Sequence, residues 1–156
     1  MPKSKIEVGG KAPQFTLDGT NGSWSPEDGK GSALVIYFYP RDNTSGCTQE
    51  GLDFAALHAQ FKKAKAQIFG ISPDSVAAHE KFKKKQSFPF ELLSDPEHTA
   101  CKLYDVFKEK SMYGRKYMGV ERSTFLIDGK GVLRHEWRKV KVKNHAEAVL
   151  AAVKAL

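Results

Sequence analysis

The sequence has little cysteine and no long hydrophobic run. Only two of its 156 residues are cysteines, too few for a small secreted domain held together by disulfide bonds. No apolar stretch is long enough to cross a bilayer, so we expect no membrane partner. The basic start of the chain lacks the apolar segment of a secretory signal, and we therefore expect a cytoplasmic protein.

Internal repeats, low-complexity tracts and a convincing domain linker are also missing from the sequence. Hydrophobic residues make up 40% of the chain and charged residues 28%, a composition typical of globular proteins rather than disordered ones. A chain of 156 residues is long enough to bury a substantial core. We therefore expect one domain that covers residues 1–156.

Positive charge is in excess, with a net charge of +7 and a pI of about 9.4. Lysines and arginines cluster at residues 62–65, 81–85 and 138–143. No recognised nucleic-acid-binding motif accompanies these clusters, so we interpret them as solvated faces and expect no nucleic-acid partner. A basic nucleic-acid-binding protein with an incidental cysteine remains an alternative from another functional class.

Strand and helix patterns alternate along most of the chain. Turn residues split residues 12–31 into short pieces and predict an N-terminal β-hairpin. The β-branched and aromatic run at residues 32–39 indicates a strand buried on both faces. Further strands are predicted at residues 66–72 and 90–95 and as a hairpin at 122–137, and helices at about 44–61, 74–86, 96–107 and 144–156. This order favours an α/β fold with a mixed central sheet flanked by helices.

Three helix starts are predicted from their capping residues. Asp74 or Ser75 suits the N-cap of the second helix, and Pro96 suits the first turn of the third. Asn144 and Glu147 have the spacing of a capping box at the start of the last helix.

Cys47 lies where the buried strand at residues 32–39 leads into a helix. Open α/β folds place ligands at such strand ends, and Thr44 or Ser45 as N-cap would put Cys47 in the first helical turn. Free backbone N–H groups there favour a negative charge, so we expect a reactive thiolate. The alternative is a small, buried and inert thiol.

Other cysteine chemistries fit the sequence less well. There is no Cys-x-x-Cys pair for dithiol exchange. A cysteine hydrolase needs a histidine base, and all five histidines lie in segments that read as ordinary helix or strand surface. His98 and Cys101 share a predicted helix, but two ligands do not make a zinc site, and we expect no metal and no cofactor.

The motif Pro40-x-x-x-Thr44-x-x-Cys47 resembles the peroxiredoxin signature. Its surroundings are similar to those of the bacterioferritin comigratory protein subfamily, also called BCP or PrxQ. The resemblance covers about residues 13–156 and implies a thioredoxin-like fold and a thiol-dependent peroxidase that reduces hydrogen peroxide and organic hydroperoxides. A thioredoxin-fold protein that exchanges thiols without fast peroxide chemistry is the alternative enzyme.

The resemblance also implies roles for individual residues. Cys47 matches the peroxidatic cysteine, and Thr44 matches the residue whose hydroxyl bonds the sulfur and the peroxide. Pro40 matches the residue that shields the pocket from water. Arg122 matches the arginine that stabilises the thiolate and the bound peroxide, and Glu50 matches the acid that orients this arginine.

The sequence departs from the subfamily at the resolving cysteine. The two usual positions of that cysteine carry Leu52 and Lys83. Cys101 neighbours a predicted apolar face, and we interpret it as a packed, inert thiol rather than a resolver. We therefore expect a monomeric one-cysteine enzyme whose sulfenic acid is reduced by an external thiol from thioredoxin, glutaredoxin or glutathione.

Overall fold

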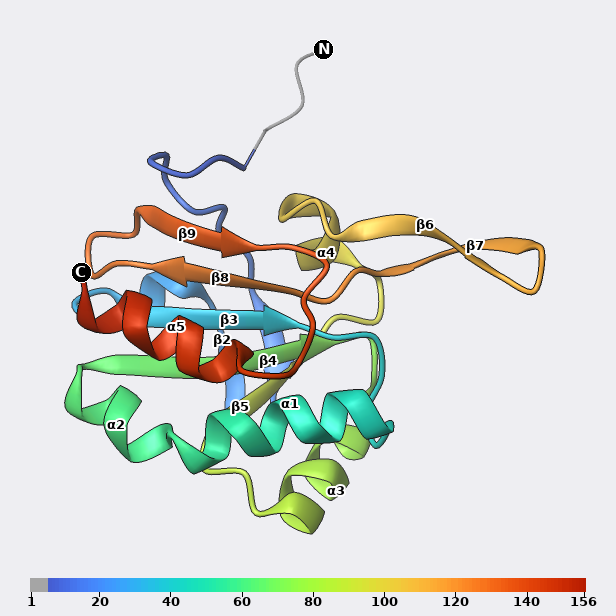
Figure 1. Cartoon of the computed structure of the whole chain (residues 1–156), viewed down its shortest axis with the longest axis horizontal. Coiled ribbons are helices and arrows are strands. Elements are labelled where there is room, and N and C mark those ends of the chain that lie inside the picture. Colours follow the sequence, from blue (N-terminus) through green and yellow to red (C-terminus); the bar gives the residue numbers. More distant parts are fainter. Residues whose placement is uncertain (1–5) are drawn as a thin grey trace.

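The computed structural model describes residues 6–156, so residues 1–5 of the predicted domain, and with them part of its basic start, lie outside the described residues. Seven strands of the described chain form one sheet in the order β2-β1-β5-β4-β3-β8-β9 (Figure 1). These strands are β1 (Leu17–Gly19), β2 (Gly22–Trp24), β3 (Ala33–Phe38), β4 (Ala66–Ser72), β5 (Glu91–Ser94), β8 (Ser123–Ile127) and β9 (Leu133–Trp137).

The sheet is mixed, as the sequence predicted. β3 pairs in parallel with β4, and β4 with β5, while β8 runs antiparallel to β3 and β9 antiparallel to β8. β1 and β2 form the predicted N-terminal hairpin, and β1 borders β5. A 3-10 turn, η1 (Pro26–Gly29), leads from this hairpin to β3.

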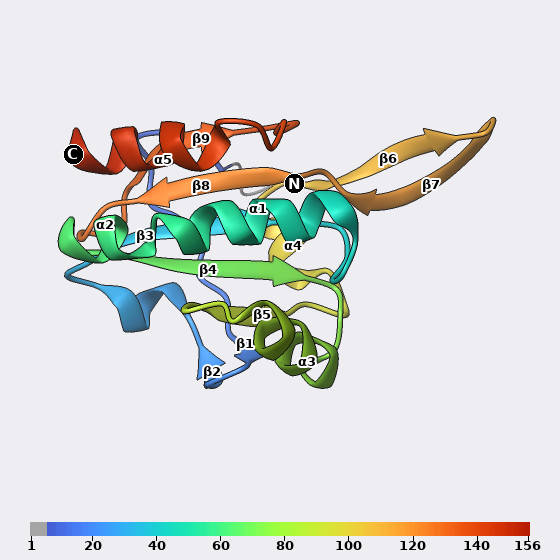
Figure 2. The same cartoon turned by 60° about the horizontal axis from the view of Figure 1, so that its bottom comes forward.

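Five helices accompany the strands in the described part of the chain. They are α1 (Ser45–Ala56), α2 (His58–Lys63), α3 (Val76–Gln86), α4 (Thr99–Leu103) and α5 (His145–Lys154). α1 and α5 contact each other on one side of the sheet, as Figures 1 and 2 show. None of the helices formed by residues 6–156 is both long and apolar enough to cross a membrane.

Strand β3 separates two hydrophobic cores. All six of its side chains are buried, and they alternate between the two faces of the sheet. Val35 and Tyr37 belong to the core beneath α1, α2, α3 and α5, together with Cys47. Leu34 and Ile36 belong to the opposite core, which contains α4 and Cys101. The uninterrupted apolar run of β3 thus reflects burial on both faces.

The helix predicted for residues 96–107 is wrong in length. Only α4 is helical, and Pro96 lies in a turn before it rather than in its first turn. The Asp95 carboxylate accepts hydrogen bonds from the N–H groups of Ala100 and Cys101, which fixes the helix start. Asp105 has a φ of 55°, a left-handed conformation that ends the helical segment.

A second hairpin, β6 (Phe107–Met112) and β7 (Arg115–Val120), is absent from the sequence-based expectation. Its strands are largely polar, so they lack the apolar alternation that marks a half-buried strand. Positive φ angles at Tyr113 and Gly114 suit the two-residue turn that joins them. The hairpin projects from the body of the molecule (Figure 1). It exposes Met112, Tyr113, Tyr117 and Met118.

The predicted caps have mixed outcomes. Ser75 is the N-cap of α3 and accepts a hydrogen bond from the N–H of Ala78 at 3.1 Å, which confirms one of the two residues proposed. Asn144 is the N-cap of α5, as predicted, but the capping box is wrong, because Asn144 is left-handed, with a φ of 62°, and its side chain makes no capping bond. The helix predicted over residues 44–61 is divided into α1 and α2 at Leu57.

Gly51 allows α1 to approach the segment before β5. A Cβ at this position would lie 2.4 Å from the ring of Phe88, which is buried. Alanine normally stabilises a helix interior by about 1 kcal/mol relative to glycine. We predict that Gly51→Ala instead lowers the free energy of unfolding by about 1–3 kcal/mol, measured in urea, because the Phe88 ring must move.

Gly119→Ala is the control for this substitution. Its Cβ would meet only the Lys110 and Tyr117 side chains at 3.4 Å, and we expect a much smaller change in the free energy of unfolding. A Gly51→Ala protein more stable than the wild type would show that the close approach to Phe88 is absent.

Candidate active site

Cys47 is the third residue of α1, in the first helical turn, as expected from the sequence. Thr44 is the N-cap, with extended φ and ψ of −90° and 158°. The first helical bond runs from the N–H of Thr48 to the carbonyl of Thr44 at 2.8 Å. The N–H groups of residues 45–47 therefore have no acceptor within the helix and favour a negative charge near Cys47. The Cys47 side chain is buried, with 2% of the residue exposed.

Arg122 reaches Cys47 because of the pairing between β3 and β8. Phe38, the last residue of β3, is opposite Ser123, the first residue of β8. The residue before β8 is thus held beside the loop that follows β3. From there the Nη2 of Arg122 donates to the Sγ of Cys47 at 3.3 Å.

Glu50 is the second partner of Arg122. It follows Cys47 by three residues on α1, so the two side chains lie on the same face of the helix. The Nη1 of Arg122 donates to the Oε1 of Glu50 at 2.6 Å. One guanidinium therefore links the carboxylate and the sulfur, which places three of the sequence-predicted residues in a single contact network.

Burial and neighbouring charges shift the pKa values of Glu50 and Arg122. Glu50 is 1% exposed, and burial raises its pKa to about 7 even though the neighbouring Arg122 lowers it. Burial lowers the pKa of the Arg122 guanidinium. The neighbouring Glu50 and Cys47 have a larger effect than burial, so the pKa of Arg122 is raised. The Oε2 of Glu50 has no hydrogen-bond partner among the described residues.

Gly46 gives the guanidinium its space, a role that the sequence did not indicate. A Cβ at this position would lie 3.2 Å from the Nη2 of Arg122, which is closer than most real contacts. Lys110 of β6 is a second neighbour that sequence reasoning missed. Burial, followed by the charge of Arg122, lowers the pKa of Lys110. The sequence does not show that Gly46 and Lys110 are neighbours of Arg122, because this depends on how the fold places Arg122.

Thr44 and Pro40 lie in the loop between β3 and α1. In this structure the hydroxyl of Thr44 donates to the carbonyl of Arg41 at 3.1 Å, so its one proton is not directed at the sulfur. Pro40 is partly buried at the bend that follows Tyr39. Both residues therefore border the segment that leads to Cys47.

Cys101 lies in the opposite core, beyond the sheet from Cys47. It is fully buried, and burial together with the carboxylate of Asp95 raises the pKa of its thiol. At the two usual resolving positions, Lys83 forms an ion pair with Glu91 at 2.7 Å and Leu52 is exposed. The sheet lies between the two cores that contain these cysteines.

The expectation that all five histidines lie on the surface is wrong for two of them. His79 is 0% exposed and His145 is 7% exposed. The Nε2 of His145 lies 2.8 Å from the Oγ1 of Thr124, and burial, then the charge of Arg122, lowers the pKa of His145 to about 4. Among the described residues, the side chain hydrogen-bonded to the Cys47 sulfur is Arg122 rather than a histidine base.

Comparison with known proteins supplies the family. A profile of the AhpC/TSA family matches residues 8–136. The peroxiredoxin Bcp of Xanthomonas campestris is 53% identical over 142 residues, which are 91% of this chain and 83% of that protein. The peroxiredoxin Bcp of Bacillus subtilis is 50% identical over 150 residues, which are 96% of each chain. The chain belongs to the AhpC/TSA family, as a Bcp-type peroxiredoxin.

Solved structures confirm the thioredoxin-like fold of this peroxiredoxin. Peroxiredoxin Q of Xanthomonas campestris superposes with a TM-score of 0.87 at 51% identity and 90% coverage of both chains. A cysteine-to-serine mutant of PrxQ from Xylella fastidiosa superposes with a TM-score of 0.91 at 41% identity and 98% coverage of both. The protein is thus a thiol-dependent peroxidase that uses a peroxidatic cysteine.

Replacement of Arg122 tests the contact with the sulfur. We predict that Arg122→Leu slows the oxidation of Cys47 by hydrogen peroxide about 10²- to 10³-fold while the protein remains folded, because a preset donor is lost. Stopped-flow or quenched-flow kinetics with circular dichroism would measure both properties. Arg134→Leu is the matched control, since Arg134 is paired with Asp128, at the opposite end of β8 from Arg122. Near-wild-type kinetics in Arg122→Leu would contradict the assignment.

The raised pKa of Glu50 predicts a pH-dependent stability. Between its usual pKa of 4.5 and the folded-state pKa of about 7, the folded protein keeps a proton that the unfolded chain releases. This stabilisation is complete below the lower value and is lost as the pH rises through the higher one. Glu50→Gln removes the titrating group. When the pH rises from 4.5 to 8, the free energy of unfolding of this variant should therefore increase by about 1–3 kcal/mol relative to that of the wild type.

Urea unfolding at several pH values measures this gain. Glu91→Gln is the control with the opposite sign. Burial raises the pKa of Glu91, but hydrogen bonds from Lys83 and Thr20 outweigh burial and lower it. Parallel stability profiles for the wild type and Glu50→Gln would show that Glu50 titrates normally.

Proposed function

We propose that Cys47 is the peroxidatic cysteine. The observation that carries this assignment is the 3.3 Å contact between its sulfur and Arg122, at a helix start with free N–H groups. The thiolate attacks one oxygen of the peroxide and the O–O bond breaks. The other oxygen leaves as an alkoxide or hydroxide and takes up a proton, and Cys47 is left as a sulfenic acid.

Arg122 acts on both sides of this step. It stabilises the thiolate and is positioned beside the oxygen on which negative charge develops, so it favours the transition state over the ground state. Glu50 holds the guanidinium through the 2.6 Å bond and acts as a positioning residue. Thr44 rotates its hydroxyl from the carbonyl of Arg41 to the bound peroxide, and Pro40 shields the sulfur from water.

The enzyme uses one cysteine of its own in each catalytic cycle. The location of Cys101 in the opposite core supports this, as do the residues at the two usual resolving positions. A first external thiol condenses with the sulfenic acid to give a mixed disulfide and water. A second thiol then releases Cys47 and leaves as the oxidised reductant.

The substrates we propose are hydrogen peroxide and small organic hydroperoxides. The related Xanthomonas campestris protein has an alkyl peroxide reduction activity, studied in trapped intermediate and ligand complexes. We propose thioredoxin, glutaredoxin or glutathione as the reductant, and a single-domain, cytoplasmic monomer that needs no cofactor.

Intact mass after one equivalent of hydrogen peroxide tests the one-cysteine cycle. We predict a gain of about 16 Da that disappears when a sulfenic-acid reagent of the dimedone type forms its adduct. Cys101→Ser should behave like the wild type, and Cys47→Ser should neither gain this mass nor reduce peroxide. A loss of about 2 Da with a peptide linking Cys47 to Cys101 would instead demonstrate an internal disulfide.

A further inference from the structure

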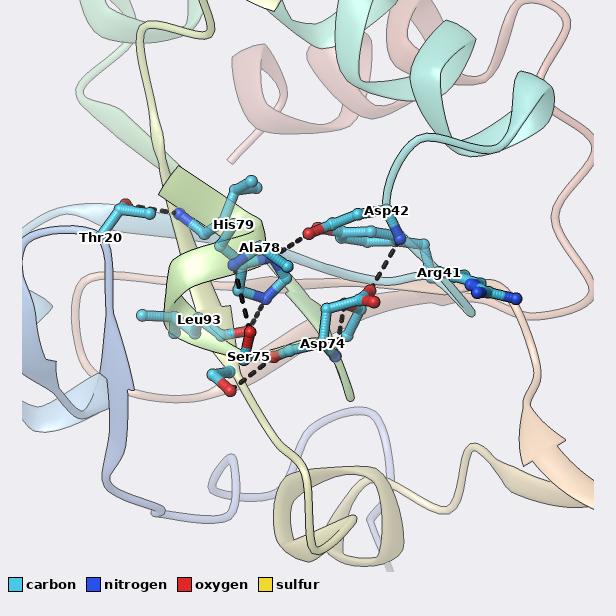
Figure 3. Close-up of polar contacts among 12 residues, drawn as sticks. Thr20, Arg41, Asp42, Asp74, Ser75, Ala78, His79 and Leu93 are labelled. Carbon is cyan, nitrogen blue, oxygen red and sulfur yellow. Dashed lines mark hydrogen bonds and ion pairs between the residues drawn. The ribbon is translucent and has the colours of Figure 1, made fainter. Parts of the chain in front are cut away.

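A buried hydrogen-bond network holds the loop that leads to Cys47. Its centre is Asp42, which lies between Pro40 and Thr44 and is 9% exposed. Figure 3 shows Asp42 directed toward His79 of α3, with Asp74 close to its main chain. The Oδ1 of Asp42 accepts from the hydroxyl of Tyr39 at 2.6 Å. The network therefore links the loop to elements that are distant in sequence.

The ring of His79 makes two hydrogen bonds inside the protein. Its Nδ1 lies 2.7 Å from the Oδ2 of Asp42, and its Nε2 lies 2.9 Å from the carbonyl of Leu93 in β5. A carbonyl can only accept, so Nε2 carries a proton. A second proton must then lie between Nδ1 and Oδ2. The pair of side chains thus shares its protons without net charge, which makes its complete burial tolerable.

Asp74 holds the main chain of the same loop. Its Oδ2 accepts from the backbone N–H of Asp42 at 2.7 Å and from the hydroxyl of Ser72 at 2.6 Å. The carbonyl of Asp74 in turn accepts from the hydroxyl of Ser94. Both the side chain and the main chain of Asp42 are therefore tied to the ends of β4 and β5 and to α3.

Hydrogen bonds use the atoms of this network that could otherwise bind a metal ion. Atoms of Asp42, Asp74 and His79 that could bind a metal ion lie within 4.8 Å of one another. The hydrogen bonds described above already engage both ring nitrogens and both carboxylates. We therefore interpret the cluster as structural support for the loop.

We propose that Asp42, His79 and Asp74 are positioning residues that set the reactivity of Cys47. The loop of residues 40–44 has no regular structure, and Asn43 adopts a left-handed φ of 65°. Besides the bond from Thr44 to Arg41, contacts with other elements therefore fix its course. Because α1 begins where this loop ends, a shift of the loop moves Cys47 relative to Arg122. A misplacement of about 1 Å can slow a positioned reaction by about 100-fold.

The inference deepens the proposed function, since it rests on Cys47 being the peroxidatic thiol. Residue 83 on α3 is a lysine and not a resolving cysteine. The helix α3 therefore does not have to move to form a disulfide with Cys47 during the catalytic cycle. The network would instead keep α3 and the loop together, so that the sulfenic acid forms and is reduced in one arrangement of the site.

Two buried tyrosines offer a matched test of the network. Tyr39 and Tyr104 are 1% and 0% exposed, and each hydroxyl donates one hydrogen bond, to Asp42 in the first case and to the carbonyl of Pro13 in the second. Tyr39→Phe and Tyr104→Phe thus remove the same group from equally buried sites. We expect Tyr39→Phe to slow the oxidation of Cys47 by hydrogen peroxide about 3- to 10-fold and Tyr104→Phe to leave it unchanged.

Two substitutions of His79 separate positioning from stability. In His79→Asn, the side-chain amide can take the place of Nδ1 and keep the contact with Asp42. In His79→Gln, the side-chain amide takes the place of Nε2 and keeps only the contact with Leu93. Each variant loses one buried hydrogen bond. We expect His79→Gln to slow Cys47 oxidation about 10- to 100-fold and His79→Asn to preserve most of the rate.

Quenched-flow mass spectrometry of Cys47 oxidation, with hydrogen exchange of residues 40–47, supplies the readout. Slower oxidation and faster exchange in Tyr39→Phe and His79→Gln support the proposal. Wild-type rates in both variants overturn it, as do equal losses in all four variants. If the His79 variants do not fold, the tyrosine pair decides. Wild-type Cys47 that is no faster than free cysteine would instead refute the proposed function itself.

Discussion

The guanidinium of Arg122 donates to the carboxylate of Glu50 and to the sulfur of Cys47, and neither of these groups is open to solvent. A buried carboxylate without a cation would be costly, and the raised pKa of Glu50 shows how far burial favours its protonated form. In the proposed mechanism the arginine therefore has two roles. It stabilises charge at the sulfur, and it compensates the acid that orients it.

The fold provides this contact by bringing together segments far apart in the sequence. β3 ends at the loop that starts α1, and antiparallel pairing sets the beginning of β8 beside that end. Gly46 leaves room for the guanidinium where α1 approaches it. On the other side of the loop, Asp42, His79 and Asp74 connect the same segment to β4, β5 and α3. The sulfur is thus bonded to Arg122, and the loop that leads to it is bonded to a separate hydrogen-bond network.

The sequence predicted those elements whose local pattern agrees with their final environment. β3 and β4 are apolar runs buried on both faces, and Ser75 caps α3 through a local bond. The hairpin of β6 and β7 was missed because its strands are polar and exposed, and α4 was overextended because a left-handed Asp105 cannot be read from composition. For these elements, tertiary contacts or single backbone angles decided the structure.

The active site, too, could be predicted from the sequence only where the local pattern was informative. Cys47 stands out at a strand-to-helix junction, but Arg122 is one of 25 lysines and arginines and was identified only through the family resemblance. His79 was interpreted as ordinary helix surface, whereas its ring is fully buried against Asp42. A polar residue on a charged helix reveals its role only when its partners, here Asp42 at 37 residues and Leu93 at 14 residues along the chain, are placed beside it.

The most direct test of the account compares two reactions of Cys47 in the wild-type protein. Rate constants with hydrogen peroxide and with iodoacetamide are measured at one pH, each relative to free cysteine. If the donors around the sulfur are preset for the peroxide transition state, the enhancement with peroxide exceeds that with iodoacetamide by at least about 100-fold. Equal enhancements, or none, would contradict the central role given to Arg122.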